Sequence, residues 1–74
     1  MTNDKVAKCW AEGKPAQGSN FRTDGVYVWS YFTVIAYKDT DGVPVITTKK
    51  YSVSTSRHTT YCLRAATNAR RETF

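Results

Sequence analysis

The most strongly patterned part of this 74-residue chain is VYVWSYFTVIAY, Val26–Tyr37. It contains no charge, no Gly and no Pro, and its β-branched and aromatic side chains favour a largely buried strand. We therefore expect one central strand, with side chains that alternate between two faces. The aliphatic face, predicted to be core, carries Val26, Val28, Ser30, Phe32, Val34 and Ala36. The aromatic face carries Tyr27, Trp29, Tyr31, Thr33, Ile35 and Tyr37.

The chain before this strand predicts a helix and then a loop. A helix is expected from Asn3 or Asp4 to about Glu12, because either residue can cap its start. Its apolar stripe would comprise Val6, Cys9 and Trp10. Residues 14–25 are rich in Gly, Ser, Asn and Asp, which predicts a loop.

Two more elements are expected after the central strand. Lys38–Gly42 is typical of a hairpin turn, and Val45–Val53 predicts a second strand. The adjacent Lys49 and Lys50 favour an edge position for that strand. A closing helix is expected over Arg57–Arg70, capped by a residue of the Ser54–Ser56 run. Its inner face would carry His58, Tyr61, Cys62, Ala65 and Ala69.

These elements predict a single α+β domain over residues 1–74. It would be a small antiparallel sheet of two long strands with an N-terminal and a C-terminal helix, in the order α-β-β-α. Two strands make a weak sheet, so we expect a third from residues 14–25 or from a second copy of the chain. If the third strand comes from a second copy, the two copies would form a homodimer through the Val45–Val53 edge.

The basic charge is concentrated near the C-terminus. Residues 1–48 carry five basic and five acidic side chains, whereas residues 49–74 carry six basic and one acidic. The net charge of +5 therefore arises from the last third of the chain. This favours an acidic partner, which is either nucleic acid or an acidic protein surface.

Two groups of side chains are candidates for binding. Arg57, Arg64 and Arg71 recur every seven residues along the predicted closing helix, and such groups bind phosphate oxygens. A merely solvated basic helix face is the alternative. Aromatic residues of the central strand form either a stacking platform for unpaired bases or core packing. The full set of binding candidates is Lys49, Lys50, Arg57, Arg64, Asn68, Arg70, Arg71, Tyr27, Trp29 and Tyr31.

Signals for catalysis, cofactors and membrane insertion are weak. His58 and Cys62 are four residues apart on one predicted helix face, but no third group is evident that would orient a nucleophile. Adding Cys9 makes only three candidate metal ligands without a CxxC pair. We therefore expect no enzyme, cofactor or metal, and free cysteines unless an oxidising compartment joins Cys9 to Cys62. No apolar run reaches the roughly 18 residues of a membrane span and no signal peptide is present, so a cytoplasmic location is expected.

The chain resembles small uncharacterised proteins encoded by bacteriophages and related mobile elements. The residues that carry the resemblance are GKPA at Gly13–Ala16, TDG at Thr23–Gly25, WSY at Trp29–Tyr31, IA at Ile35–Ala36 and KYSVSTSRH at Lys50–His58. A second Thr usually stands at the position of Ser54. The resemblance brings no established activity, and it implies an accessory protein that acts inside a bacterial cell.

The sequence thus supports three functional hypotheses. The first is a non-enzymatic phage accessory protein that binds nucleic acid through a basic C-terminal helix. The second is a phage-encoded inhibitor that binds a host protein, such as a component of a defence system. The third is a structural or assembly role, with dimerisation through the Val45–Val53 edge.

Overall fold

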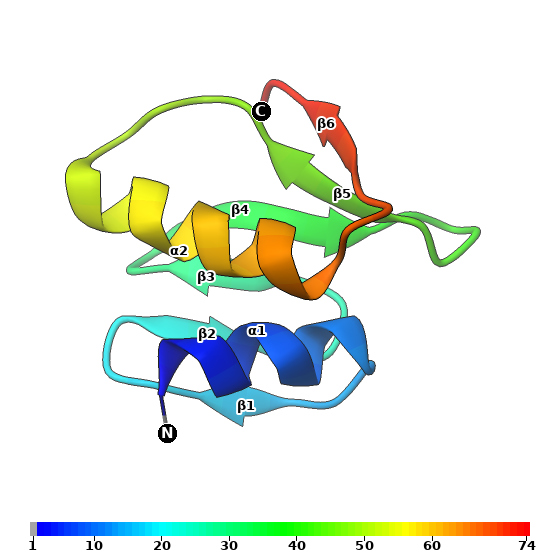
Figure 1. Ribbon diagram of the computed structural model, residues 1–74, viewed down its shortest axis with the longest axis horizontal. Coiled ribbons are helices and arrows are strands. Elements are labelled where there is room, and N and C mark those ends of the chain that lie inside the picture. The colour runs from blue at the N-terminus through cyan, green and yellow to red at the C-terminus, as the bar shows by residue number, and fades with distance from the viewer. Residues whose placement is uncertain (1) are drawn as a thin grey trace.

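The computed structural model describes residues 2–74, which form two helices on one face of a six-stranded sheet (Figure 1). The helices are α1 (Asn3–Ala11) and α2 (Val53–Ala65). The strands are β1 (Ala16–Gln17), β2 (Phe21–Thr23), β3 (Val28–Ser30), β4 (Thr33–Lys38), β5 (Pro44–Thr47) and β6 (Arg70–Glu72). Their order in the sheet follows their order in the chain, and all neighbours are antiparallel except β5 and β6. The architecture is α+β, but the predicted small sheet in the order α-β-β-α is wrong.

The predicted central strand is two strands. Tyr31 and Phe32 form a two-residue turn between β3 and β4. Tyr31 has a φ of 58°, a conformation that Gly or Asn usually supplies, so nothing in the sequence signals this turn. The Tyr31 amide donates to the carbonyl oxygen of Asn20 at 2.8 Å, which ties the turn to the loop between β1 and β2. Phe32, predicted to be core, is therefore 96% exposed.

A β-bulge alters the predicted faces of this hairpin. Val28 pairs with Ala36 and Trp29 with Val34, which leaves Ile35 as the extra residue. Ile35 and Ala36 consequently both belong to the core beneath the helices. The predicted core position of Val34 and the predicted aromatic-face position of Ile35 are wrong, because a period of two cannot anticipate a bulge. Val26, also predicted to be core, is exposed.

The N-terminal helix is confirmed as α1. Its N-cap is Thr2, whose side chain accepts from the Lys5 amide, rather than Asn3 or Asp4. Within the predicted stripe Val6 and Trp10 are fully buried and Cys9 is partly buried. The predicted loop over residues 14–25 is instead the β1–β2 hairpin, whose strands are too short to leave a periodic signal.

The second predicted strand is shorter and more central than expected. β5 ends at Thr47, so Lys49 and Lys50 lie in the loop that follows it. β5 pairs with β4 on one side and with β6 on the other, so it is not an edge. The edge proposed for a homodimer is therefore occupied by the chain's own last strand.

The closing helix begins and ends earlier than predicted. Ser52 is its N-cap and accepts from the Thr55 amide at 3.2 Å, so α2 starts at Val53 rather than Arg57. It ends at Ala65, because Ala66 leaves helical geometry with φ −124° and ψ 79°. His58 and Cys62 are buried on its inner side as predicted, whereas Ala69 lies beyond its end.

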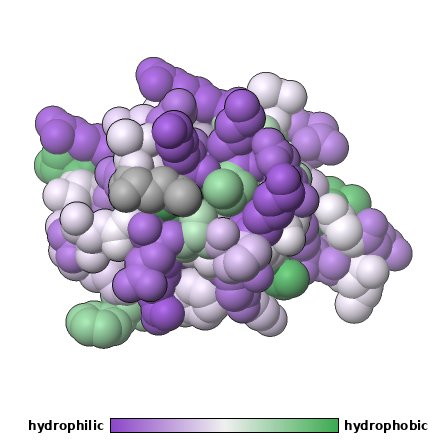
Figure 2. Space-filling view, turned by 90° about the horizontal axis from the view of Figure 1, so that it is seen from below, coloured by the Kyte–Doolittle hydropathy of each residue, from purple (hydrophilic) through white to green (hydrophobic). Residues whose placement is uncertain are grey.

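The core lies between the helices and the sheet. It comprises Val6, Ala7, Trp10, Phe21, Val28, Ile35, Ala36, Ile46, Cys62 and Ala66. The Trp10 indole N–H donates to the carbonyl oxygen of Val26 at 2.9 Å, which satisfies its polar atom and fixes α1 on the sheet. Viewed from the β1 edge, the surface is mostly hydrophilic and its hydrophobic groups stand apart (Figure 2). Within residues 2–74 no helix has the length and apolarity needed to cross a membrane.

Candidate functional site

Two of the predicted arginines lie together on α2. Arg57 and Arg64 are exposed and lie two turns apart on the outer side of the helix. With Thr60 and Tyr61 they line an open pocket of about 160 Å³. Arg64 also borders a neighbouring depression that it shares with Asp4 and Lys8 of α1. Asn68 is not part of this group, because it lines a separate pocket with residues such as Ala11 and Lys38.

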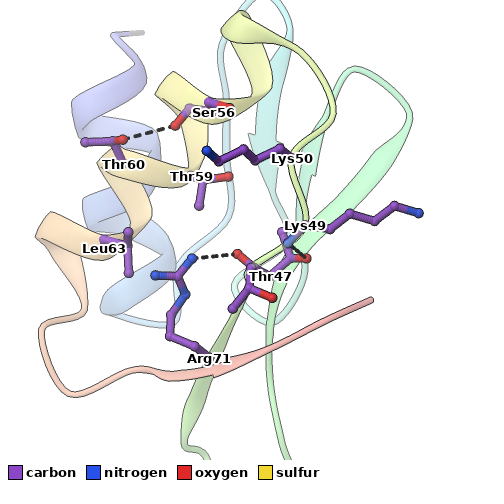
Figure 3. Close-up of a pocket in the computed structure, with 9 residues that line it drawn as sticks. Thr47, Lys49, Lys50, Ser56, Thr59, Thr60, Leu63 and Arg71 are labelled. Carbon is purple, nitrogen blue, oxygen red and sulfur yellow. Dashed lines mark hydrogen bonds between the residues drawn. The ribbon is translucent and has the colours of Figure 1, made fainter.

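Arg71 lies on β6 rather than on α2, yet its side chain reaches toward the same helix (Figure 3). Its Nε donates to the carbonyl oxygen of Ile46 at 3.3 Å, and Nη2 donates to that of Thr47 at 3.0 Å. These two bonds hold the guanidinium in one orientation. The predicted seven-residue arginine stripe along a single helix is therefore wrong, because α2 ends before Arg71.

An open pocket of about 180 Å³ lies between α2, the loop after β5 and strand β6. Its lining residues are Thr47, Thr48, Lys49, Lys50, Ser56, Thr59, Thr60, Leu63 and Arg71. The Lys50 side chain points toward Thr59 on α2, whereas that of Lys49 points away from the pocket (Figure 3). The Lys49 ammonium instead lies 5.2 Å from the centre of the Tyr51 ring. We call this site the Arg71–Lys50 pocket; none of its lining residues is acidic.

The ion pairs show which cations are neutralised. The salt bridges within residues 2–74 join Lys14 to Glu12 at 3.6 Å, and Arg70 to Asp39 at 3.2 Å and to Glu72 at 2.7 Å. The hydrogen bonds that Arg70 donates to Glu72 and Asp39 raise the pKa of Arg70 above its ordinary value, with Glu72 contributing most. Arg70, a predicted binding residue, is thus paired internally.

Nine of the eleven basic side chains form no salt bridge within residues 2–74: Lys5, Lys8, Arg22, Lys38, Lys49, Lys50, Arg57, Arg64 and Arg71. Four of these nine line the pockets on α2, β6 and the loop after β5. We call these four the helix-side basic surface, which consists of Lys50, Arg57, Arg64 and Arg71. Thr60 lines both the Arg71–Lys50 pocket and the Arg57–Arg64 pocket, so the surface is continuous along the helix.

The opposite face of the sheet carries an aromatic row. The ring centres of Tyr27 and Trp29 are 5.9 Å apart, and those of Tyr27 and Tyr37 are 6.3 Å apart. Phe74 meets Tyr37 edge to face at 5.3 Å, and the Arg22 guanidinium lies 4.5 Å from the centre of the Trp29 ring. The predicted pairing of Tyr27 with Trp29 on one face is confirmed. Neither Arg22 nor Phe74 was predicted from the sequence to lie in this row. The β2–β3 pairing places Arg22 beside Trp29, and the fold of the C-terminal segment places Phe74 against Tyr37.

Part of this aromatic row is packing rather than open surface. The carbonyl oxygen of Phe74 accepts hydrogen bonds from Thr47 Oγ1 at 3.1 Å and from the Tyr51 hydroxyl at 2.7 Å. Val45 and Thr47 are fully buried there. Tyr31 does not join the row, since its ring lies 6.1 Å from that of His58 at the β3–β4 turn. The predicted three-ring platform is therefore reduced to Tyr27 and Trp29.

His58 has structural partners. Its Nδ1 lies 2.6 Å from Ser30 Oγ, which also donates to Thr55 Oγ1 at 3.1 Å, and its ring stacks on Phe21 at 4.6 Å. Burial lowers the pKa of His58 and raises that of Cys62 to about 12, so both groups are held neutral. Ser30 is buried, which leaves no room for a substrate beside this Ser–His pair. Cys9 and Cys62 are free thiols, and residues 2–74 contain no cluster of three metal-ligating side chains.

A family model described as "Family of unknown function (DUF8033)" matches residues 4–73. The chain belongs to the DUF8033 family. The match runs from α1 through β6, so it covers both helices and the whole sheet. No curated protein and no solved structure matches the chain.

The TDG segment of this DUF8033 chain has a structural role. The Asp24 carboxylate accepts from the amides of Tyr27 and Val26, and these hydrogen bonds lower its pKa. Gly25 has a φ of 100°, and a Cβ there would lie 2.7 Å from the carbonyl oxygen of Gly13. These residues therefore build the turn between β2 and β3.

The KYSVSTSRH segment divides between structure and surface. Ser52 caps α2, and His58 and Thr55 anchor that helix to Ser30. Lys50 and Arg57 are the two members of the segment that belong to the helix-side basic surface. The KYSVSTSRH segment thus includes both the start of α2 and two cations of the helix-side basic surface.

Proposed function

We propose that this DUF8033 protein is a non-enzymatic nucleic-acid-binding protein, and that the helix-side basic surface contacts phosphates. The observation that carries the proposal is the grouping of these four cations along one side of α2, none of them with a carboxylate partner in residues 2–74. Phosphate oxygens are their natural acceptors, because guanidinium and ammonium groups form strong charge-assisted hydrogen bonds with them. The resemblance to phage-encoded proteins supports an accessory role inside a bacterial cell.

Binding of this kind depends steeply on salt. Each phosphate that is neutralised releases condensed counterions, with a slope of about −0.9 in log K against log salt for duplex DNA. If all four cations contact phosphates, the slope is about −3.6, and affinity falls roughly 100-fold between 50 and 200 mM salt.

The test compares two double variants of equal charge. R57Q/R64Q removes two cations from the helix-side basic surface. R22Q/K49Q removes two cations from the opposite side of the sheet, where they lie over Trp29 and Tyr51. Fluorescence anisotropy at low salt, with labelled duplex and single-stranded oligonucleotides, should show a loss of roughly tenfold or more for the first variant. The second variant should lose less than about twofold.

Two results would contradict the proposal. One is the absence of binding by the wild-type chain at low salt. The other is an equal loss in the two double variants, because that would indicate a response to net charge without a defined surface. Thermal unfolding of both variants controls for loss of fold.

A second candidate function rests on exposed apolar side chains. Phe32 and Val53 are 96% and 73% exposed. Both lie at the end of the molecule where the β3–β4 turn meets the start of α2, as the hydrogen bond between Ser30 and Thr55 shows. Exposed apolar anchors of this kind favour docking on a protein, as an inhibitor of a host component would require.

A pull-down from nuclease-treated bacterial lysate separates the two functions. The inhibitor function predicts one stoichiometric partner that the wild-type chain retains and F32S loses. Capture that persists in F32S, or capture abolished by nuclease treatment, argues against it.

A further inference from the structure

We propose that the Arg71–Lys50 pocket binds one phosphate group, which fixes the register of a nucleic acid on the helix-side basic surface. This inference rests on the proposed function and adds a defined site to it. It distinguishes the pocket from Arg57 and Arg64, because Arg71 is held by two backbone carbonyls, whereas Arg57 and Arg64 are free to follow a phosphate backbone.

The first support is the orientation of Arg71. A guanidinium has five N–H donors, and Arg71 uses one on the Ile46 carbonyl and one on the Thr47 carbonyl. The three remaining N–H groups belong to Nη1 and Nη2 and keep the orientation that these carbonyls impose. A surface arginine normally loses rotamer freedom when it binds an anion, and here part of that loss has already occurred on folding.

The second support is the set of donors opposite Arg71. The Lys50 ammonium points toward α2 at Thr59 (Figure 3). Thr59 and Thr60 donate their hydroxyl hydrogens to the carbonyls of Thr55 and Ser56, so these two hydroxyls can only accept further bonds. Ser56 Oγ makes no hydrogen bond within residues 2–74, so its hydrogen is available for an anion.

The donors thus come from three elements. Arg71 belongs to β6, Lys50 to the loop after β5 and Ser56 to α2, so they surround the space rather than follow one edge (Figure 3). A tetrahedral oxyanion can accept from all three at once, whereas a carboxylate offers only two oxygens. No acidic residue lines the pocket to oppose an anion.

The size of the pocket also suits a phosphate. Its volume of about 180 Å³ corresponds to roughly six water molecules at ~30 Å³ each. That space admits a phosphate group with part of its hydration shell. The phosphate could be an internal diester or a terminal monoester, since both present the same oxyanion chemistry.

The first experiment uses inorganic phosphate as the probe. Amide chemical shifts are followed by NMR as sodium phosphate is added to the ¹⁵N-labelled chain, against sodium chloride at matched ionic strength. Saturable shifts are expected at Thr59, Thr60 and Arg71. They should weaken roughly tenfold in K50Q and roughly threefold or more in S56A, because each variant removes one donor. These two variants leave β6 unaltered.

The matched control is R22Q. It removes the same charge from a residue that does not line the pocket, and whose guanidinium lies 4.5 Å from the centre of the Trp29 ring on the opposite face of the sheet. Its phosphate affinity should stay within about twofold of the wild-type value. R71K completes the series, since it keeps the charge but loses the bonds that orient the guanidinium, and it should weaken binding roughly tenfold.

A second experiment distinguishes the two sources of phosphate. Short oligonucleotides with a 5′-phosphate or a 5′-hydroxyl are compared by anisotropy. A terminal monoester site predicts tighter binding of the phosphorylated form, and the difference should vanish in K50Q. An internal diester site predicts equal binding of both forms and an equal loss in K50Q.

The outcomes separate the pocket from the wider function. The pocket is refuted if phosphate causes no saturable shifts, if acetate reproduces them, or if R22Q and K50Q weaken binding alike. Nucleic-acid binding without phosphate binding refutes the pocket and leaves the helix-side surface standing. Phosphate binding without nucleic-acid binding supports the pocket and removes the proposed function.

Discussion

The contacts that hold His58 are uncharged. It is 6% exposed, it stacks on Phe21, and its polar neighbours Ser30 and Thr55 are uncharged hydroxyls. Burial therefore lowers its pKa below the ordinary value of 6.5. It is the only histidine in the chain, so its titration can be followed without interference from another.

This burial predicts a loss of stability in mild acid. Below a pH of about 6.5 the unfolded chain binds a proton at His58 that the native chain resists, so the unfolded state holds more protons. The free energy of unfolding should therefore fall as pH drops from 7.5 to 5.5, which urea denaturation at several pH values measures. Asp24 and Asp39, whose pKa values are lowered mainly by backbone amides, should titrate below this window.

The matched variant is His58→Gln. It should be less stable than the wild-type chain throughout, because it loses the stack on Phe21, but it should show no pH dependence between 7.5 and 5.5. A wild-type chain whose stability stays constant across this range would show that His58 is free to protonate in the folded state.

The hydrogen bonds at the start of α2 predict that Ser52, among the serines of this segment, contributes most to stability. Ser52 Oγ accepts from the Thr55 amide at 3.2 Å and donates to Thr55 Oγ1 at 3.1 Å. Ser52→Ala should therefore lower the free energy of unfolding by about 1 kcal/mol. Ser54→Ala, at an exposed position inside the first turn, should change it by less than about 0.5 kcal/mol. Chemical denaturation of both variants measures the difference, and equal effects would place the cap elsewhere.

Local signals predicted some elements and not others. α1 could be predicted because its apolar spacing and the glycine after it act within a few residues of the helix. The β3–β4 turn could not, because Tyr31 adopts a conformation that glycine usually supplies and a contact to Asn20 maintains it. β6 is exposed at every residue, so it carries no burial pattern. It is defined by its partner β5, which lies far away in the sequence.

The candidate site was predictable in its composition and not in its layout. The excess charge of the last third of the chain does form a basic surface. The period of seven that linked three arginines, however, assumed a longer helix than the chain forms. Neighbouring Arg70 and Arg71 face opposite sides of β6 because of strand geometry, so one is paired with Asp39 and Glu72 and the other reaches α2.

Across the whole molecule, the two faces differ in character. The helix side carries the helix-side basic surface, while the opposite side carries the aromatic row, with Arg22 and Lys49 over rings and Arg70 in ion pairs. Net charge alone could not reveal this division, because it depends on which strands are neighbours. Because of this division, variants that lose the same charge on opposite sides can show whether binding depends on one face or on net charge alone.

The parallel pairing of β5 with β6 joins strands that are separated by a longer segment of chain than any other strand pair. Every antiparallel pair joins strands that are adjacent along the chain, whereas β6 docks only after residues 48–69 have crossed over through α2. Closing the longer loop costs more chain entropy, so we expect β6 to pair last during folding and to open first. Because Arg71 belongs to β6, an anion bound between Arg71 and Lys50 would stabilise the pairing of β6 with β5.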